Sequence, residues 1–381
     1  MTGSVYLDCN ATAPIRPEAA DAALRALQIG GNPSSVHAAG RAARAVLEAA
    51  RESVAGLAGA RAADITFTSG GSEANALALQ SALRAGSRRL ILGATEHASL
   101  FEAADASGLP VELWPVDARG VADPDWLSDR LRRWDAEDGA PFVALMLANN
   151  ETGVIQPVAE AAALTHAAAG WLHVDAVQAA GRIAIDLKAL GADTLALSAH
   201  KLGGPQGSGA LVQRPTTAVT RSLFGGGQER GRRGGTENLS GIAGFGAAAR
   251  LAAVEPAQDQ AAWRDAVAER LKAEAGVVVM GEGAPRLGNT LCIACDGYSS
   301  ELQVMAMDLA RVMISAGSAC SSGKVKASHV IAAMGRPDLA ACSIRVSGGW
   351  STTQDDWDRF AGAWLDAHAR RSSRARTLVE A

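Results

Sequence analysis

The chain has 381 residues, of which 48% are apolar and 20% charged, a composition that excludes a disordered or fibrous protein. Its 36 basic and 40 acidic side chains give a formal net charge of −4, so a protein that works by gripping nucleic-acid phosphates is not expected. Five cysteines are too sparse for a secreted disulfide framework. No signal-peptide pattern and no apolar run of roughly 18 residues occurs, so we expect no membrane insertion and a cytoplasmic location.

Short apolar runs alternate with helical patterns from about residue 15 to 250. We predict strands at 65–68, 89–93, 111–114, 142–147, 171–175 and 194–198, with helices between most of them. Strands separated by helices of roughly 10–15 residues indicate a doubly wound α/β domain with a mainly parallel sheet.

The pattern changes after about residue 250. A long polar helix is predicted over 255–274, followed by strands at 277–280, 289–295, 312–315 and 343–347 and by helices at 300–311 and 353–371. We therefore expect a large domain over 15–250 and a smaller α+β domain formed by 1–14 and 251–381.

Polar residues follow several predicted strands, at the sheet edge where α/β proteins bind ligands. Gly71 and Ser72 lie in a small-residue turn between the strand at 65–68 and a helix. A helix N-terminus with small residues can bind a phosphate, although an ordinary N-cap at Ser72 explains the same residues.

Lys201 is one of only five lysines, and it follows the apolar strand at 194–198. A lysine there is either an ion-pair partner or a desolvated amine suited to forming a Schiff base. Asp175 ends the strand at 171–175 and favours the second interpretation, because pyridoxal phosphate needs a lysine and a carboxylate that keeps its pyridine nitrogen protonated.

Further polar groups near predicted strand ends suit the same cofactor. Ser72, Ser198 and His200 are candidates for its phosphate, Gln178 for its phenolate oxygen, His97 for stacking on its ring, and Asn150 for a substrate carboxylate. Each residue also has an ordinary explanation as a cap, core histidine or turn. The glycine-rich loop at 225–238 is either a flexible surface loop or an anion-binding or subunit contact.

Cys320 lies in a loop of glycine and serine at 317–323, close in sequence to Lys324 and Lys326. A thiol there can be exposed and partly ionised. Cys292 and Cys295 lie in a predicted strand, where positions three apart face opposite sides, so neither a metal site nor a redox pair is expected.

Motifs spread over nearly the whole chain carry a family resemblance. They include YLDCNATAP, GNPSSVHAAGR, FTSGGSEANALAL, TEHASL, NNETGVIQPV, HVDAVQAAG, SAHKLGGPQGSGAL, GGGQERGRRGGTEN, GSACSSG and SIRVSGG. In these segments the chain resembles the cysteine desulfurases of the class V aminotransferase group, which are pyridoxal phosphate enzymes of fold type I, and in particular the nitrogen-fixation and iron–sulfur-cluster type.

The resemblance implies a role for each matched position. Around the cofactor ring, Lys201 resembles the cofactor-linked lysine, Asp175 the partner of the pyridine nitrogen, Gln178 the contact to the phenolate oxygen and His97 the stacking imidazole. At the phosphate, the matched residues are Gly71, Ser72, Ser198 and His200, and Thr236 resembles a phosphate contact made across a homodimer. Asn150 and Arg345 resemble the clamp for the substrate carboxylate, and Cys320 resembles the nucleophile. The implied reaction converts L-cysteine to L-alanine and leaves the sulfur as a persulfide on Cys320, for transfer to an iron–sulfur scaffold or another acceptor.

The sequence departs from the family pattern at several places, and its C-terminal tail is short and basic. Trp350 stands where many members have arginine, and Lys324-Val325-Lys326-Ala327 replaces a stretch that is often Leu-Glu-Pro-like. Three alternatives stay open from the sequence: an aminotransferase, a selenocysteine lyase, and a non-catalytic assembly protein that binds pyridoxal phosphate. Product analysis with L-cysteine separates them.

Overall fold

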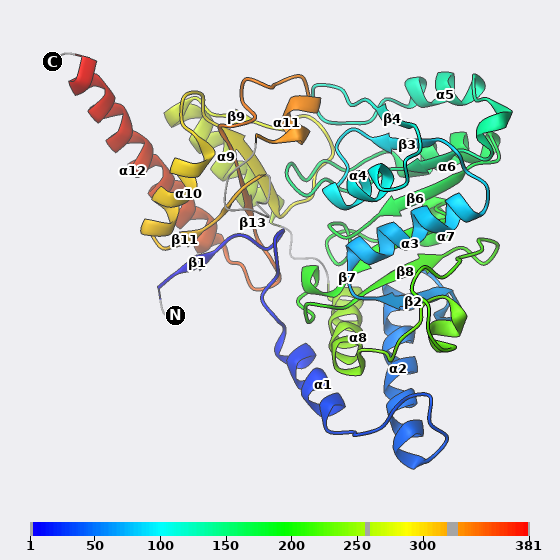
Figure 1. The fold of residues 1–381 in the computed structure, drawn as a ribbon. Helices are drawn as coiled ribbons and strands as arrows, with labels where there is room; N and C mark the ends of the chain where they lie inside the picture. Colours follow the sequence, from blue (N-terminus) through cyan, green and yellow to red (C-terminus); the bar gives the residue numbers. More distant parts are fainter. Residues whose placement is uncertain (1–2, 256–259, 318–326, 380–381) are drawn as a thin grey trace.

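The computed structural model describes residues 3–255, 260–317 and 327–379. A large seven-stranded sheet with helices on its two faces forms one part of the molecule, and a smaller sheet with its own helices forms the other (Figure 1). The N-terminal strand belongs to the smaller part, and the chain then crosses to the larger one.

The large sheet has the strand order β2-β8-β7-β6-β5-β3-β4. Its strands are β2 (Ile65–Thr68), β3 (Leu90–Gly93), β4 (Val111–Trp114), β5 (Phe142–Ala144), β6 (Trp171–Asp175), β7 (Thr194–Ser198) and β8 (Gly209–Gln213). Neighbours from β4 to β7 pair in parallel, which confirms the predicted mainly parallel α/β sheet.

Strand β8 was not predicted, and it runs antiparallel to both of its neighbours. The connection from β7 to β8 spans only residues 199–208 and contains no α-helix. A parallel crossover needs roughly a dozen residues or more, so this short connection reverses the chain direction.

Helices cover both faces of the large sheet, and the strands are correspondingly apolar on both sides. Leu90 and Leu92 of β3 pack with α3 (Gly71–Arg84) and α4 (Ala98–Asp105), whereas Ile91 between them belongs to the cluster on the opposite face. That second face is covered by α2 (Ala38–Leu57), α5 (Pro124–Arg132), α6 (Val158–Ala167), α7 (Leu187–Leu190) and α8 (Leu239–Val254), and α1 (Pro17–Leu27) packs on α8.

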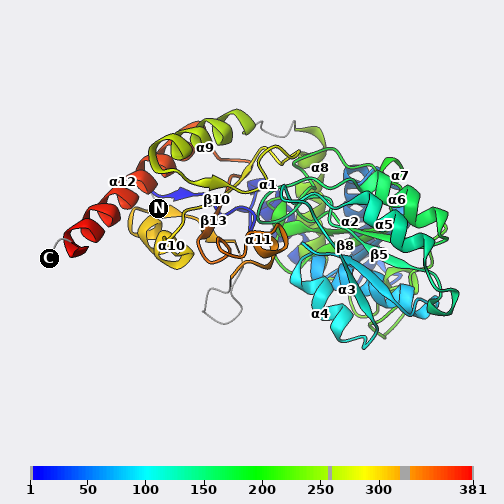
Figure 2. The ribbon, with the colours of Figure 1, turned by 90° about the horizontal axis from the view of Figure 1, so that it is seen from above.

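The smaller sheet is antiparallel, with the order β12-β13-β10-β9. Its strands are β9 (Val278–Val279), β10 (Thr290–Ala294), β12 (Ser315–Ala316) and β13 (Ser343–Ser347), and β1 (Val5–Tyr6) pairs beside it with β11 (Val312–Met313). The helices of this part are α9 (Ala261–Ala275), α10 (Ser300–Leu309), α11 (His329–Ala333) and α12 (Gln354–Val379), of which α9, α10 and α12 lie together away from the large sheet (Figure 2).

A separate apolar core holds the smaller part together. Trp357, Phe360 and Trp364 of α12 are fully buried against Ile344 of β13 and Leu7 of the N-terminal segment. Aromatic side chains of this size bury large areas and dominate the energetics of a small core.

Two details differ from the predicted helices of this part. The helix predicted over 255–274 begins at Ala261, and the C-terminal helix extends beyond residue 371 to Val379. Within residues 3–255, 260–317 and 327–379, no helix combines the length and apolar character needed to cross a bilayer.

Candidate active site

A cavity of about 260 Å³ opens where the strands of the large sheet end, as the parallel topology requires. Nine of the predicted site residues line it: Gly71, Ser72, His97, Asn150, Asp175, Gln178, Ser198, His200 and Lys201. A second cavity of about 300 Å³ lies on the other side of Lys201 and shares only that residue with the first. We refer to the first as the strand-end cavity.

One end of the strand-end cavity is built to receive an anion. Helix α3 begins at Gly71, so the N–H groups of Gly71 and Ser72 have no acceptor within the helix and its dipole favours negative charge there. The hydroxyls of Ser72 and Ser198 face the same cavity and make no hydrogen bond within the described part of the chain. A Cβ at Gly71 would lie 2.7 Å from Cγ2 of Val177, so only glycine allows this close approach.

His200 adds a neutral ring to this anion-binding end. Burial, followed by the nearby charge of Lys201, lowers the pKa of His200 to about 4. Its Nδ1 lies 3.0 Å from Oγ1 of Thr12. The ring therefore stays uncharged near neutral pH and can serve as a hydrogen-bonding group.

Asp175, the last residue of β6, places a carboxylate in the cavity wall. Its Oδ1 accepts a hydrogen bond from the backbone N–H of Val177 at 3.0 Å, and its Oδ2 accepts one from Nδ2 of Asn75 at 2.8 Å. The side chain is only 6% exposed. These donors hold the carboxylate in one orientation.

Lys201 ends η3, a short 3₁₀ helix (Ala199–Lys201) that follows β7. Its Nζ donates to the backbone oxygens of Asn10 at 2.5 Å and of Ala11 at 2.8 Å. Burial, and then the positive charges of Arg345 and Arg182, lower the pKa of Lys201 to about 7. The amine is therefore available in its uncharged, nucleophilic form near neutral pH.

His97 and Gln178 occupy two further positions on the cavity wall. Residue His97 caps the N-terminus of α4, and its Nδ1 accepts a hydrogen bond from the backbone N–H of Ser99 at 3.2 Å. Burial is the main cause that lowers the pKa of His97. The amide of Gln178 donates to the backbone oxygen of Asn10 at 3.0 Å and accepts from Arg182.

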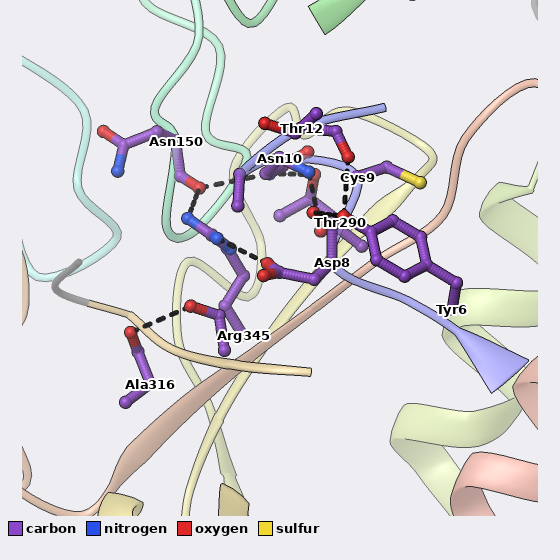
Figure 3. A network of polar contacts seen from close by, with 12 residues as sticks. Tyr6, Asp8, Cys9, Asn10, Thr12, Asn150, Thr290, Ala316 and Arg345 are labelled. Atoms are coloured by element: carbon purple, nitrogen blue, oxygen red, sulfur yellow. Dashed lines mark hydrogen bonds and ion pairs between the residues drawn. The ribbon is translucent and has the colours of Figure 1, made fainter. Parts of the chain in front are cut away.

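Arg345 of β13 brings the smaller sheet to the edge of the strand-end cavity. Its Nη1 donates to the backbone oxygen of Asn150 at 3.1 Å and its Nη2 to Oδ1 of Asp8 at 2.8 Å (Figure 3). The residue is only 3% exposed, and within the described residues its Nε has no hydrogen-bond partner. A guanidinium with a free N–H beside a cavity residue suits a carboxylate ligand.

The structure does not bring Thr236 into this cavity. The residue is exposed and lines a different cavity, of about 150 Å³, together with Ser69 and Gly207. Cys320, Lys324 and Lys326 lie outside the described residues.

The two residues near the ends of the segment 318–326 both contact Glu151. A Cβ at Gly317 would lie 2.5 Å from Oε2 of Glu151, and Oγ of Ser328 donates to the same oxygen at 2.6 Å. Because Glu151 follows the cavity residue Asn150, Gly317 and Ser328 both lie close to the strand-end cavity.

Several polar residues of the site were not singled out from the sequence. Asn75 holds Asp175, Asp8 pairs with Arg345, and the backbone of Asn10 accepts from both Lys201 and Gln178. For Asn75 a signal exists, since it is a polar residue on the helix face that packs on a buried sheet, and such groups need a partner. The partners of Asp8 and Asn10 depend on how the two parts of the molecule meet.

The donor set of the strand-end cavity fits pyridoxal phosphate. The anion-binding end suits a phosphate, Asp175 can hold a proton on a pyridine nitrogen, and Lys201 provides an amine of lowered pKa. Among the described residues, no cluster of three or more histidine, cysteine or acidic side chains is arranged to hold a metal ion.

Comparison with known proteins gives the family. Residues 5–360 match the model of the family described as aminotransferase class-V. The cysteine desulfurase of Cereibacter sphaeroides is 43% identical over 366 residues and the alignment covers 93% of each chain, and the cysteine desulfurase IscS of Dictyoglomus turgidum is 37% identical over 368 residues, covering 93% of this chain and 92% of that one.

A solved structure agrees with these sequence relatives. The NifS-like protein from Rickettsia africae superposes with a TM-score of 0.87 at 31% identity, over 96% of this chain and 99% of that one. The predicted resemblance and the predicted fold type are thus confirmed. The chain belongs to the class-V aminotransferase family, in its branch of cysteine desulfurases.

Proposed function

We propose that this protein is a pyridoxal-phosphate-dependent cysteine desulfurase that carries sulfur on Cys320. The observation that carries the proposal is a convergence at one sheet edge. Lys201, Asp175 and an anion-binding helix end line a single cavity. Arg345 contacts the cavity residue Asn150, and Gly317 and Ser328, which flank the segment that contains Cys320, both contact the neighbouring Glu151.

Each group around the cofactor has one task. The first turn of α3, with Ser72, Ser198 and His200, binds the phosphate, and Asp175 holds a proton at the pyridine nitrogen. His97 stacks on the ring, and Gln178 donates to the phenolate oxygen. Bound pyridoxal phosphate supplies an electron sink for bonds broken next to the substrate amine. Lys201 anchors the cofactor and, through its lowered pKa, can accept and return protons near neutral pH.

Asn150 and Arg345 orient the substrate by its carboxylate. The thiolate of Cys320 attacks the substrate sulfur, forming the new S–S bond while the C–S bond breaks. L-cysteine and the Cys320 thiol thus become L-alanine and a Cys320 persulfide, which balances without an added oxidant or reductant. A thiolate is the required nucleophile.

The cysteines that the structure describes support the choice of Cys320. Burial raises the pKa of Cys9 to about 12 and raises the pKa values of Cys292 and Cys295 as well. Cys292 of β10 and Cys295, which directly follows that strand, pack in separate apolar clusters, consistent with buried hydrophobic roles. Thiols held protonated in this way are poor nucleophiles.

The same proposal includes a homodimer and two domains per chain. Thr236 is exposed and does not line the strand-end cavity of its own chain, which supports a phosphate contact made to the partner subunit. Separate apolar cores support a large domain at 15–250 and a smaller domain formed by 1–14 and 251–381.

An iron–sulfur scaffold is the proposed acceptor, on the strength of relatives that carry the name IscS. The cytoplasm is the proposed location, because a thiol that alternates with a persulfide is best maintained where the surroundings are reducing.

The test is turnover of L-cysteine by the purified holoenzyme and by single serine variants. Cys320→Ser should retain the cofactor and bind L-cysteine but form no persulfide and almost no alanine. Cys342→Ser is the matched control, since Cys342 is a half-buried thiol of the same proposed domain, and it should turn over like the parent. Production of a keto acid by the parent, or alanine released at the parent rate by Cys320→Ser, would overturn the proposal.

A further inference from the structure

A line of buried polar side chains runs through the large sheet to Asp175. Its members come from β6, β7 and α3 and are, in order, Trp171, Thr194, His173, Asn75 and Asp175. The three residues between the two ends are at most 1% exposed. Nε1 of Trp171 donates to Oγ1 of Thr194 at 3.0 Å, and this oxygen lies 2.9 Å from Nδ1 of His173. Nε2 of His173 lies 2.9 Å from Oδ1 of Asn75.

The chemistry of the two ends fixes the direction of every hydrogen bond in this line. An indole N–H can only donate, so the oxygen of Thr194 accepts from Trp171 and turns its own proton toward Nδ1 of His173. At the other end the carboxylate of Asp175 accepts, so the amide nitrogen of Asn75 must face it and the amide oxygen must face His173. A flipped amide would set two acceptors against each other.

Both ends therefore demand the same tautomer of His173, with its proton on Nε2 and its Nδ1 accepting. Burial lowers the pKa of His173 to about 4, so the ring is neutral near neutral pH. The ring also stacks on Phe142, with centroids 6.2 Å apart and planes 17° apart. His173 is thus held in one orientation as well as in one protonation state.

Asn75 is a branch point rather than a simple link. Its Nδ2 donates to Oδ2 of Asp175 at 2.8 Å and to Oγ of Ser99 at 3.0 Å, which uses both amide protons. The hydroxyl of Ser99 lies 2.9 Å from Nδ1 of His97 and has its proton free to donate there, while the backbone N–H of Ser99 also points at that nitrogen. Nδ1 of His97 accordingly accepts hydrogen bonds from Ser99, and the proton of the neutral ring lies on Nε2.

We propose that Asn75, oriented by His173 and Thr194, is a positioning residue that sets the orientation of the Asp175 carboxylate and the tautomer of His97 together. The two cofactor-facing side chains are thereby fixed by a single amide. This inference rests on the proposed function only in taking pyridoxal phosphate as the ligand of the strand-end cavity.

The chain offers a sharp set of variants. Asn75→Asp keeps the shape of the side chain but removes the two amide protons that bind Asp175 and Ser99. Thr194→Val removes the hydroxyl at the far end of the line, and Thr194→Ser restores it. Thr66→Val is the matched control, because Thr66 is an equally buried threonine of the same sheet whose hydroxyl has no partner within the described residues.

Two measurements on the apoprotein test the inference without L-cysteine. The two-bond ¹H–¹⁵N correlations of ¹⁵N-labelled histidine report the tautomers, with His97→Gln and His173→Gln used for assignment. Titration with pyridoxal phosphate reports cofactor affinity.

In the parent, both rings should carry the proton on Nε2. Asn75→Asp should shift His97 toward the other tautomer and weaken cofactor binding by about tenfold, the loss expected for hydrogen bonds to a charged group. Thr194→Val should leave the proton of His173 on Nε2, because Oδ1 of Asn75 still accepts from it, but it removes the donor to Nδ1 and should cause a smaller loss of cofactor affinity. The Thr194→Ser and Thr66→Val proteins should behave like the parent.

Two results would overturn the inference. One is a parent His97 with its proton on Nδ1. The other is a folded Asn75→Asp protein with unchanged histidine tautomers and cofactor affinity. If that variant does not fold, a parent-like cofactor affinity in Thr194→Val would overturn the inference. Failure of the parent to convert L-cysteine would instead overturn the proposed function and leave this inference standing.

Discussion

The two halves of the site are built in different ways. The cofactor half comes from the strand ends of one sheet, and its key carboxylate, on Asp175, is held by donors from the same part of the molecule. The substrate half comes from three segments that are distant in the chain, since Arg345 of the smaller sheet contacts Asp8 of the N-terminal segment and Asn150 of the large part.

This difference has a functional consequence. A set of groups fixed within one packed sheet is organised before any ligand binds, and its geometry changes little when distant contacts are altered. A set assembled between two parts depends on how those parts meet. We therefore expect substitutions in the first half to act on cofactor retention, and substitutions in the second half to act on the KM for the substrate.

Lys201→Ala should have the largest effect and should fall entirely on the cofactor half. Loss of the amine removes the covalent anchor and the group that exchanges protons, so turnover should fall by at least about 10³-fold. After borohydride reduction of the parent, mass mapping should find the cofactor on Lys201. Lys188→Ala removes an exposed lysine of α7 and should leave both results unchanged. A cofactor adduct on another lysine would contradict the assignment.

Arg345→Lys should separate the two halves. A lysine cannot serve Asp8, Asn150 and a substrate carboxylate at once, because it lacks the planar fork of the guanidinium. We expect KM for L-cysteine to rise by about ten- to a hundredfold, with cofactor affinity unchanged. Arg336→Lys is the control, since Arg336 makes only an exposed ion pair with Asp338. A loss of cofactor affinity in Arg345→Lys would show that the halves are not independent.

The pH dependence of cofactor incorporation tests how the cofactor half treats its amine. The pKa of Lys201 is lowered from an ordinary value of 10.5 to about 7, and only the uncharged amine attacks an aldehyde. The rate at which apoprotein takes up pyridoxal phosphate should therefore rise about tenfold per pH unit below 7 and level off above it. A rate that keeps rising to pH 10 would mean that burial does not depress this pKa.

The contrast between the halves also explains what could be predicted from the sequence. Asp175, Lys201 and Ser198 were predicted because each follows a recognisable apolar strand, and the topology of a parallel sheet brings such positions together. Strand β8 was missed, because it follows a short glycine-rich connection without the α-helix that separates most of the predicted strands. The contact of Arg345 with Asp8 was missed as well, since 337 positions of the chain separate the two residues, and Asn150, 195 positions away, was placed with Arg345 only through the family resemblance.

Trp350 offers the smallest and most selective test of the substrate half. The residue stands where many relatives carry arginine, and in this protein its Nε1 donates to the backbone oxygen of Pro14 at 2.8 Å. The guanidinium of Arg16 lies over its ring, 5.1 Å from the centroid, and also pairs with Glu255 at 2.6 Å. Trp350 of the smaller part therefore contacts, through Arg16, the segment that leads into the large part, close to Lys201 in the lining of the second cavity.

Because the ring is 37% exposed and its contacts are few, Trp350→Ala should lower the free energy of unfolding by only about 1 kcal/mol. Trp350→Phe keeps a ring for Arg16 but loses the hydrogen bond, so its loss should be smaller. If the substrate half depends on how the two parts meet, Trp350→Ala should also raise KM a few-fold while the affinity for pyridoxal phosphate stays at the parent value. Denaturant unfolding, cofactor titration and steady-state kinetics on the same preparations measure all three quantities. A cofactor affinity that falls as KM rises would instead mean that the strand-end cavity depends on the contact between the two parts as much as Arg345 does.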